Sequence, residues 1–351
     1  AAELEERMME WLQRAMGIPK DWEGVIQDTA SSATLVAILT AREKVTNFEA
    51  NENGVPPNLR VYCSTQTHSS IEKAVKIAGI GRKNLVKIPV DEQMRMRADA
   101  LDAQIQQDME SGYLPCCVVT AVGTTGTVAV DPIPEISAIC ARHNVWHHID
   151  AAYAGSALIL PEYQWMIEGM EQADSFVFNP HKWLFTNFDC TAYYVKDADM
   201  LVRTFDILPE YLKTRTRGQV NDYRDWGIPL GRRFRALKLW FVMRSFGLKG
   251  MQERLRQHIV LNTQFAEWVE QSENFELLLP PFLNFTCFRY RPDGQTEEAL
   301  NALNQALVER VNQRGKLFLT HTKIEDQYVL RMVFGQTYVE KRHMEAARAE
   351  L

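Results

Sequence analysis

The sequence predicts an α/β protein with a mostly parallel sheet sandwiched by helices. Short apolar runs that are typical of strands alternate with helical stretches through the middle of the chain. Polar residues follow several of these runs at the ends where parallel strands meet. Of the 351 residues, 46% are apolar, which is enough for a sizeable core. Alternation of this kind is typical of βαβ units.

Helices come first along the chain. An apolar face with helical spacing predicts a helix that begins at the first residue and that Gly17 ends. A second, largely buried helix is predicted over 29–44, with hydroxyl residues as N-cap candidates. A third is predicted over 69–78, where Ser69 and Glu72 have the spacing of a capping box.

Strands and helices then alternate before the pattern changes near residue 231. The expected strands of the first part are 115–122, 145–149, 175–179 and 191–195, with a helix at 135–143. The expected elements of the second part are helices at 231–246, 250–272 and 296–313 and strands at 282–290, 316–320 and 328–334.

This change predicts a large domain over 1–250 and a smaller C-terminal α/β domain over 251–351. The helical pattern at 339–351 is still running at the last residue. We therefore expect the smaller domain to be truncated.

Charge and composition argue against several classes of protein. The net charge is -6 and the pI is near 5.8, whereas nucleic-acid-binding domains are usually basic. No apolar run approaches the roughly 18 residues of a transmembrane helix, and no signal peptide is visible. The six cysteines form no C-x-x-C pair, which favours a reduced, cytoplasmic compartment.

Lys182 follows the end of an expected buried strand, in the segment Asn179-Pro180-His181-Lys182-Trp183. A lysine is rarely buried without a chemical reason. A desolvated amine with a lowered pKa is the group that attacks a carbonyl to form a Schiff base. The position of Lys182 therefore indicates Schiff-base chemistry.

Asp150 follows the neighbouring expected strand, and the segment after it, Ala151-Ala152-Tyr153-Ala154-Gly155, has small residues that let a flat ring approach closely. Taken alone, such an aspartate is more often a helix N-cap. Together with Lys182 it completes the pair that pyridoxal phosphate (PLP) needs, a carboxylate at the pyridine nitrogen and an amine at the aldehyde.

Other candidate residues stand at predicted helix starts. Thr29-Ala30-Ser31 could hold a phosphate on free N–H groups, although plain N-capping also explains the triplet. His68 could stack on a cofactor ring or could be a surface or capping residue. Motifs for ATP and dinucleotides are absent from the sequence. His143, His147 and His148 lack the further ligands of a zinc site, so no metal is expected.

Residues 207–230 have little apolar periodicity. A loop of this length is usually functional or disordered. It is therefore either a lid that closes over a substrate, with Tyr211 as its chemically useful residue, or an exposed loop.

Several motifs resemble the aromatic-L-amino-acid decarboxylases, the group II PLP-dependent decarboxylases of fold type I. The matching segments are 25–31, 67–70, 123–126, 148–155, 179–184 and 228–235. The resemblance covers nearly the whole chain, and the matching segments follow one another in the same order as in the family. It implies a fold type I PLP-dependent transferase-like architecture, PLP as the cofactor and carboxy-lyase activity.

The resemblance also implies individual roles. Lys182 would form the Schiff base with the cofactor, and Asp150 would keep the pyridine nitrogen protonated. His68 would stack on the ring, and Tyr211 would protonate the substrate carbon after CO2 leaves. The other cofactor-binding residues that it implies are Ala30, Ser31, Thr125, Ala152, Asn179, His181, Phe188 and, across a dimer interface, Gly231.

The implied substrate is an aromatic L-amino acid: dopa, tryptophan, tyrosine, phenylalanine or 5-hydroxytryptophan. The implied assembly is a homodimer with shared active sites. The alternatives are decarboxylation of histidine or another amino acid, an aromatic aldehyde synthase, against which Tyr211 and His68 argue, and an inactive scaffold. The N-terminal segment that packs across the dimer in the family is absent before Ala1, so we expect this chain to lack one wall of the substrate pocket.

Overall fold

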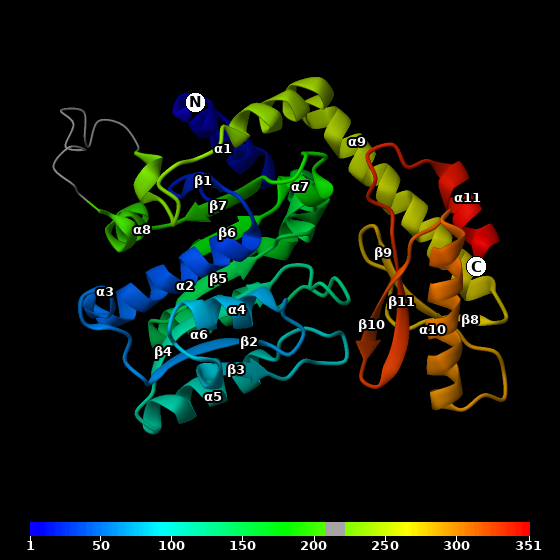
Figure 1. Cartoon of the computed structure of the whole chain (residues 1–351), viewed down its shortest axis with the longest axis horizontal. Helices are drawn as coiled ribbons and strands as arrows, with labels where there is room; N and C mark the ends of the chain where they lie inside the picture. Colours follow the sequence, from blue (N-terminus) through cyan, green and yellow to red (C-terminus); the bar gives the residue numbers. More distant parts are fainter. Residues whose placement is uncertain (208–221) are drawn as a thin grey trace. The chain divides into compact units, whose positions relative to one another are not determined.

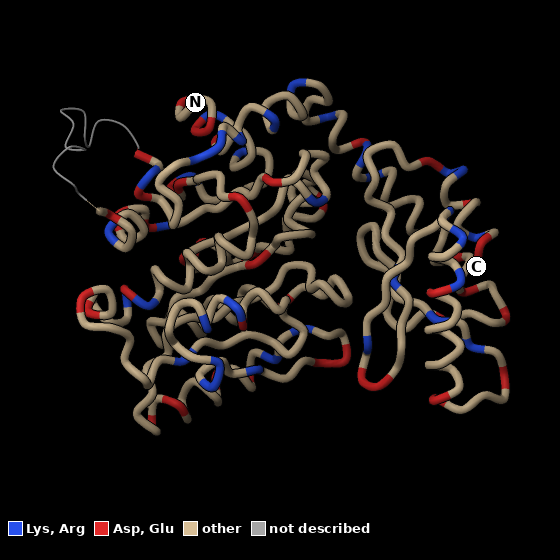
Figure 2. Tube along the Cα trace, in the orientation of Figure 1, with Lys and Arg blue, Asp and Glu red and all other residues tan. Residues whose placement is uncertain are grey.

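The computed structural model describes residues 1–207 and 222–351 (Figure 1). The chain divides into two compact units. The first comprises Ala1–Thr125 and Ala129–Leu248, and the second comprises Gly126–Val128 and Lys249–Leu351. Within the described ranges, no helix has the length and apolar character needed to cross a membrane. Acidic and basic residues are interspersed along the described trace of both units (Figure 2).

The first unit is a sheet covered by helices. Its elements are α1 (Ala2–Met16), β1 (Glu23–Gln27), α2 (Ala30–Thr46), α3 (Glu49–Asn53), β2 (Leu59–Ser64), α4 (Ser70–Ile77), β3 (Leu85–Ile88), α5 (Ala98–Glu110), β4 (Leu114–Ala121), α6 (Ile133–His143), β5 (Trp146–Asp150), β6 (Ser175–Phe178), α7 (Pro180–Trp183), β7 (Thr191–Val195), α8 (Ala198–Phe205) and the first part of α9 (Arg235–Gln271).

The seven strands of this sheet lie in the order β1-β7-β6-β5-β4-β2-β3. The pairs from β6 to β3 are parallel, whereas β7 runs antiparallel to both of its neighbours. In the register, Asp150 at the end of β5 lies opposite Ala121 on β4 and opposite Val177 on β6. The predicted α/β class with a mostly parallel sheet is confirmed, and the register brings three strand ends together.

Helices pack on the sheet through two apolar clusters. On one side, α2 is buried nearly all round, and Val36 and Ile38 have no exposed surface. A second cluster joins β2 and β4 to α5 and α6 through residues such as Ile105 and Ile136. Because α2 has apolar residues on most of its circumference, it forms a buried helix rather than an amphipathic surface helix.

The second unit has an antiparallel sheet in the order β10-β11-β9-β8. Its elements are the remainder of α9, β8 (Phe275–Leu277), β9 (Phe285–Tyr290), α10 (Glu297–Arg314), β10 (Thr320–Ile324), β11 (Gln327–Val333) and α11 (Lys341–Glu350). Phe265, Phe288 and Leu330 are fully buried in its core.

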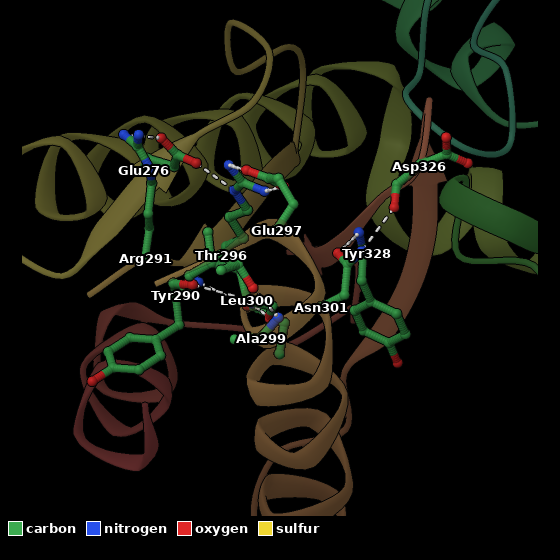
Figure 3. A network of polar contacts seen from close by, with 12 residues as sticks. Glu276, Tyr290, Arg291, Thr296, Glu297, Ala299, Leu300, Asn301, Asp326 and Tyr328 are labelled. Carbon is green, nitrogen blue, oxygen red and sulfur yellow. Dashed lines mark hydrogen bonds and ion pairs between the residues drawn. The ribbon is translucent and has the colours of Figure 1, made fainter. Parts of the chain in front are cut away.

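Polar contacts tie α10 to the strands of this unit (Figure 3). The side-chain amide of Asn304 accepts from the N–H of Tyr290 at 2.7 Å and donates to its carbonyl at 2.8 Å. Nearby, the buried guanidinium of Arg289 forms ion pairs with Glu276 and Glu297. These contacts fasten the end of β9, an inner strand of the sheet, to α10.

The predicted strand at 316–320 is wrong, because β10 begins only at Thr320. The amide of Asn312 accepts from the N–H of Leu319 at 2.7 Å and donates to its carbonyl at 2.9 Å. The backbone groups of Leu319, which the apolar pattern assigned to a strand, thus bond to the side chain of Asn312 on α10 rather than to a neighbouring strand.

One local prediction also differs from the structure. Ser69 is the N-cap of α4 but makes no side-chain capping bond, so the expected capping box is wrong. The break expected between two helices near residue 248 is confirmed, because α9 is kinked at Gly247, whose backbone (φ 65°, ψ 164°) is not helical. Strands β1, β2, β3 and β8 are additional to those predicted.

Candidate active site

A cavity of about 220 Å³ opens in the first unit, beside the carboxyl ends of β4, β5 and β6. Its wall is formed by Thr29, Ala30, Ser31, His68, Ser70, Ala121, Gly123, Thr124, Thr125, Asp150, Ala152, Tyr153, Asn179, His181, Lys182 and Phe188. Ligands bind at such strand ends in open parallel sheets. Folding therefore gathers residues from distant segments at the place where the sequence predicts a site.

Most of the predicted site residues line this cavity. The members that do so are Lys182, Asp150, His68, Ala30, Ser31, Thr125, Ala152, Asn179, His181 and Phe188. Gly231 is exposed and does not line it. Tyr211 and most of the predicted lid over 207–230 lie outside the described residues.

Lys182 stands on the short helix α7, which follows β6. Contrary to the expectation of a fully buried lysine, solvent reaches its side chain through the cavity. The surrounding protein still desolvates the amine and lowers the pKa of Lys182, although the charge of Asp150 opposes this shift. A lysine whose pKa is lowered is neutral more often, and a neutral amine is the nucleophile.

The carboxylate of Asp150 is buried at the end of β5. Burial raises its pKa, while the charge of Lys182 and the N–H of Ala152, which donates to Oδ1 at 3.0 Å, act in the opposite direction. The alternative interpretation as a helix N-cap is wrong, because the next helical segment has Tyr153 as its N-cap. No described cation forms an ion pair with Asp150 within 4.0 Å, so the site has a buried carboxylate without a cationic partner.

The N-terminus of α2 provides donors for an anion. Thr29 is its N-cap and accepts a bond from the N–H of Ser32 at 3.4 Å. The N–H groups of Ala30 and Ser31 have no hydrogen-bond partner among the described residues. Thr29 therefore caps the helix, and the two residues after it keep free donors at the cavity wall, where a phosphate is favoured.

Asn179 and His181 extend this end of the cavity. The hydroxyl of Thr191 donates to Oδ1 of Asn179 at 2.6 Å, and Nδ1 of His181 lies 2.7 Å from the carbonyl oxygen of Cys190. Burial lowers the pKa of His181. The ring of Phe188 meets His181 edge-on, with ring centroids 4.8 Å apart.

Gly123 shapes the wall between the ends of β4 and β5. It has a left-handed backbone (φ +89°), and a Cβ there would lie 2.5 Å from Cβ of Ala154. Both features exclude any larger residue without rearrangement of the wall.

Sequence reasoning assigned no separate role to Ser70, Tyr153 or Gly123, which also line the cavity. All three stand inside the segments that carry the resemblance, so their position in the motifs was the available signal. Their contacts depend on side-chain rotamers and on strand register.

The three histidines that were considered for a zinc site bind protein groups instead. His143 pairs with Asp102 at 2.8 Å. His147 and His148 are buried, each within hydrogen-bond distance of two hydroxyl groups, from Thr120 and Ser137 and from Thr34 and Ser175. The part of the chain that the structure describes contains no group of three or more His, Cys, Asp or Glu side chains that could hold a metal.

The donor set fits PLP. The buried carboxylate of Asp150 can balance a protonated ring nitrogen, the amine of Lys182 can bind the aldehyde, and free N–H groups at the start of α2 can hold the phosphate. These are the chemical groups of one cofactor rather than of unrelated sites.

Comparison with known proteins agrees with this geometry. The family model described as "Pyridoxal-dependent decarboxylase conserved domain" matches residues 1–291. An aromatic-L-amino-acid decarboxylase of Drosophila lebanonensis is 42% identical over 99% of this chain and 88% of that protein. A phenylacetaldehyde synthase of Arabidopsis thaliana is 40% identical over 99% of this chain and 72% of that protein.

Solved structures are similar as well. The crystal structure of Oryza sativa TDC with PLP and tryptamine aligns with a TM-score of 0.95 and 36% identity, over 99% of this chain and 74% of that chain.

Proposed function

Because the chain belongs to the pyridoxal-dependent decarboxylase family, we propose that it removes the carboxylate of an aromatic L-amino acid as CO2 and releases the amine. Its cofactor is PLP, and its reaction class is that of a carboxy-lyase. The observation that carries the proposal is the presence of Lys182 and Asp150 in the wall of one cavity. The aromatic substrate class is supported by the fly relative's name and by the tryptamine in the rice structure.

Bound PLP supplies an aldehyde and a ring that withdraws electrons from the breaking bond. Lys182 would hold that aldehyde through its amine. Asp150 keeps the proton on the ring nitrogen. Ala30 and Ser31 at the start of α2, with Asn179 and His181 at the start of α7, would hold the phosphate.

The remaining residues orient the reacting groups. His68 and Ala152 would pack on the ring, and Thr125 and Phe188 would lie beside it in the same cavity wall. Tyr211 delivers the proton to the carbon that has lost CO2. Positioning the scissile bond and choosing the proton donor decide the outcome, because the same cofactor supports other reactions.

An aromatic aldehyde synthase is the second candidate, because the Arabidopsis relative has that name at 40% identity. In that reaction the carbon that has lost CO2 reacts with molecular oxygen instead of taking up a proton. Release of peroxide and ammonia together with CO2 would identify it, whereas amine and CO2 alone identify the decarboxylase.

We also propose a homodimer with shared active sites. Large apolar side chains are exposed on both sides of Gly231: Ile228 50%, Leu230 62%, Phe234 47% and Phe241 58%. Surfaces of this kind mark protein interfaces, and the resemblance to the family implies that Gly231 serves the partner's cofactor across this one. Phe241→Glu is expected to give monomers in sedimentation analysis.

The domain assignment belongs to the same proposal, with 1–250 binding the cofactor and 251–351 forming the smaller domain. Cytoplasmic localisation is supported by six buried free cysteines. The partner is a small aromatic amino acid rather than a nucleic acid.

Lys182→Ala tests the function. The variant is expected to lose the visible absorbance band of covalently bound PLP and to release no CO2 from a panel of aromatic amino acids. Lys196→Ala is a matched control, because Lys196 follows the neighbouring strand β7 and lies outside the cavity wall. A Lys182→Ala protein that kept both the band and the activity would overturn the assignment.

A further inference from the structure

We propose that Ser70 is a positioning residue that holds the imidazole of His68 in one orientation and in the tautomer that carries its proton on Nε2. Both residues line the cavity. The inference deepens the proposed function, and its kinetic part rests on that function. The tautomer itself is a property of the chain alone.

Two donors of Ser70 converge on one ring nitrogen. The backbone N–H of Ser70 donates to Nδ1 of His68 at 3.1 Å, and the hydroxyl oxygen of Ser70 lies 2.8 Å from the same nitrogen. Both distances are those of ordinary hydrogen bonds. The ring is therefore held at one corner by a residue two positions along the chain.

The two contacts from Ser70 together favour one tautomer. An amide N–H can only donate, so Nδ1 must offer a lone pair. A proton on Nδ1 would face the hydrogen of the Ser70 N–H, and the two would repel each other. The neutral ring then has its proton on Nε2, and the hydroxyl of Ser70 donates to the same lone pair of Nδ1 as the backbone N–H.

The segment around the pair is itself fixed. It connects β2 to α4, and the N–H of Ile71 donates to the carbonyl of His68 at 3.1 Å. The hydroxyls of Ser64 and Thr67 lie 3.1 Å apart earlier in the same segment. Ser70 is nearly buried, whereas the ring of His68 is exposed at the cavity wall. The contact thus joins a fixed residue to a ring that would otherwise rotate.

The consequence concerns Nε2. Within the described residues, Nε2 of His68 makes no hydrogen bond. It is the ring nitrogen left for a molecule in the cavity, and in this tautomer it donates. His68 can then bind an anionic oxygen through Nε2–H but cannot accept a proton at that atom.

Nitrogen-15 NMR of histidine-labelled full-length protein, recorded without and with PLP, tests the tautomer. The wild type is expected to show a protonated Nε2 and an unprotonated Nδ1 for His68. Ser70→Ala removes the hydroxyl and keeps the backbone N–H, so the two shifts should move toward each other as the tautomers mix. Ser70→Thr should restore the wild-type shifts.

Ser69→Ala is the matched control, because the neighbouring Ser69 makes no side-chain capping bond. Its shifts should equal those of the wild type. A wild-type His68 with its proton on Nδ1 would overturn the proposal without any variant. Unchanged shifts in Ser70→Ala would overturn the role of the hydroxyl.

Steady-state kinetics of the PLP-loaded chain provide the second readout. The loss of one hydrogen bond to the ring is expected to lower kcat of Ser70→Ala about tenfold with a smaller change in KM. Ser69→Ala should match the wild type. If the wild type shows the expected tautomer but none of the proteins decarboxylates, the proposed function fails and the inference stands. If the wild type is active but His68 carries its proton on Nδ1, the inference fails and the proposed function stands.

Discussion

Tyr153 stacks on Trp183 with ring centroids 5.7 Å apart and planes 8° from parallel. Trp183 is buried and directly follows Lys182, whereas Tyr153 lies in the cavity wall just beyond Asp150. The stack therefore joins the segment that carries the carboxylate to the segment that carries the amine. Packing of two rings, rather than a bond between the two charged groups, helps to set their separation.

Replacing Trp183 should disturb this separation. We expect Trp183→Leu to weaken PLP binding at least about tenfold and to lower the free energy of unfolding by about 3 kcal/mol. Trp183→Phe keeps a ring and should lose less. A PLP titration followed by absorbance and urea unfolding measure the two effects. Trp165→Leu is the control, because Trp165 is half exposed; equal losses in both variants would contradict the role of the stack.

Asp150→Asn should separate cofactor chemistry from stability. Removal of the negative charge is expected to lower kcat at least about a hundredfold, the scale of losing a main electrostatic group in an active site. In protein without PLP, the same change should stabilise the fold near neutral pH.

The sign follows from the raised pKa of Asp150. The folded protein holds the proton more tightly than the unfolded chain, so the carboxyl destabilises the fold increasingly as pH rises above its ordinary pKa of 3.8. The difference in unfolding free energy between Asp150→Asn and the wild type should therefore grow from acid to neutral pH. Denaturant titrations at several pH values check this. A difference that does not vary with pH would be inconsistent with the buried carboxylate.

His147 should contribute to acid unfolding. Burial lowers its pKa from 6.5 to about 3. Between these values the unfolded chain binds a proton that the folded protein does not, so stability falls as pH decreases, by up to about 1.4 kcal/mol per pH unit. His147→Gln keeps hydrogen-bonding groups but does not titrate there. Its unfolding free energy should fall less steeply from pH 6 to pH 4; parallel curves would argue against a neutral buried imidazole.

Arg289 and Arg291 offer a matched pair in the second unit. Arg289 is 3% exposed and pairs with Glu276 and Glu297. Arg291 pairs with Glu276 at the surface (Figure 3). Loss of the Arg289 guanidinium removes two ion pairs and the packing of a buried side chain, whereas exposed pairs contribute less than about 1 kcal/mol. Arg289→Gln should therefore unfold at clearly lower urea concentration than Arg291→Gln. Similar midpoints for the two variants would contradict this.

The sequence predicted the strand ends well because polar residues interrupt apolar runs there. Asp150 and Lys182 could be assigned from this pattern, and the register of β4, β5 and β6 then determined that they share a cavity. The contact of Ser70 with His68 depends on a ring rotamer, which a sequence pattern does not encode.

Contacts between a side chain and a distant backbone segment could not be predicted from the sequence either. The apolar alternation near Leu319 is typical of a strand, but the backbone N–H and carbonyl of Leu319 bond to the side-chain amide of Asn312. Propensity describes the local chain, whereas this bond depends on where α10 packs.

Gly123 offers a marker for sorting other sequences. Its left-handed backbone and the 2.5 Å approach of a built Cβ to Ala154 leave room for glycine alone. A chain that keeps a lysine and an aspartate at the positions of Lys182 and Asp150 but carries a larger residue here must have a rebuilt cavity wall. Reading that one position would help to separate sequences that preserve the cofactor cavity from those that retain only the outline of the fold.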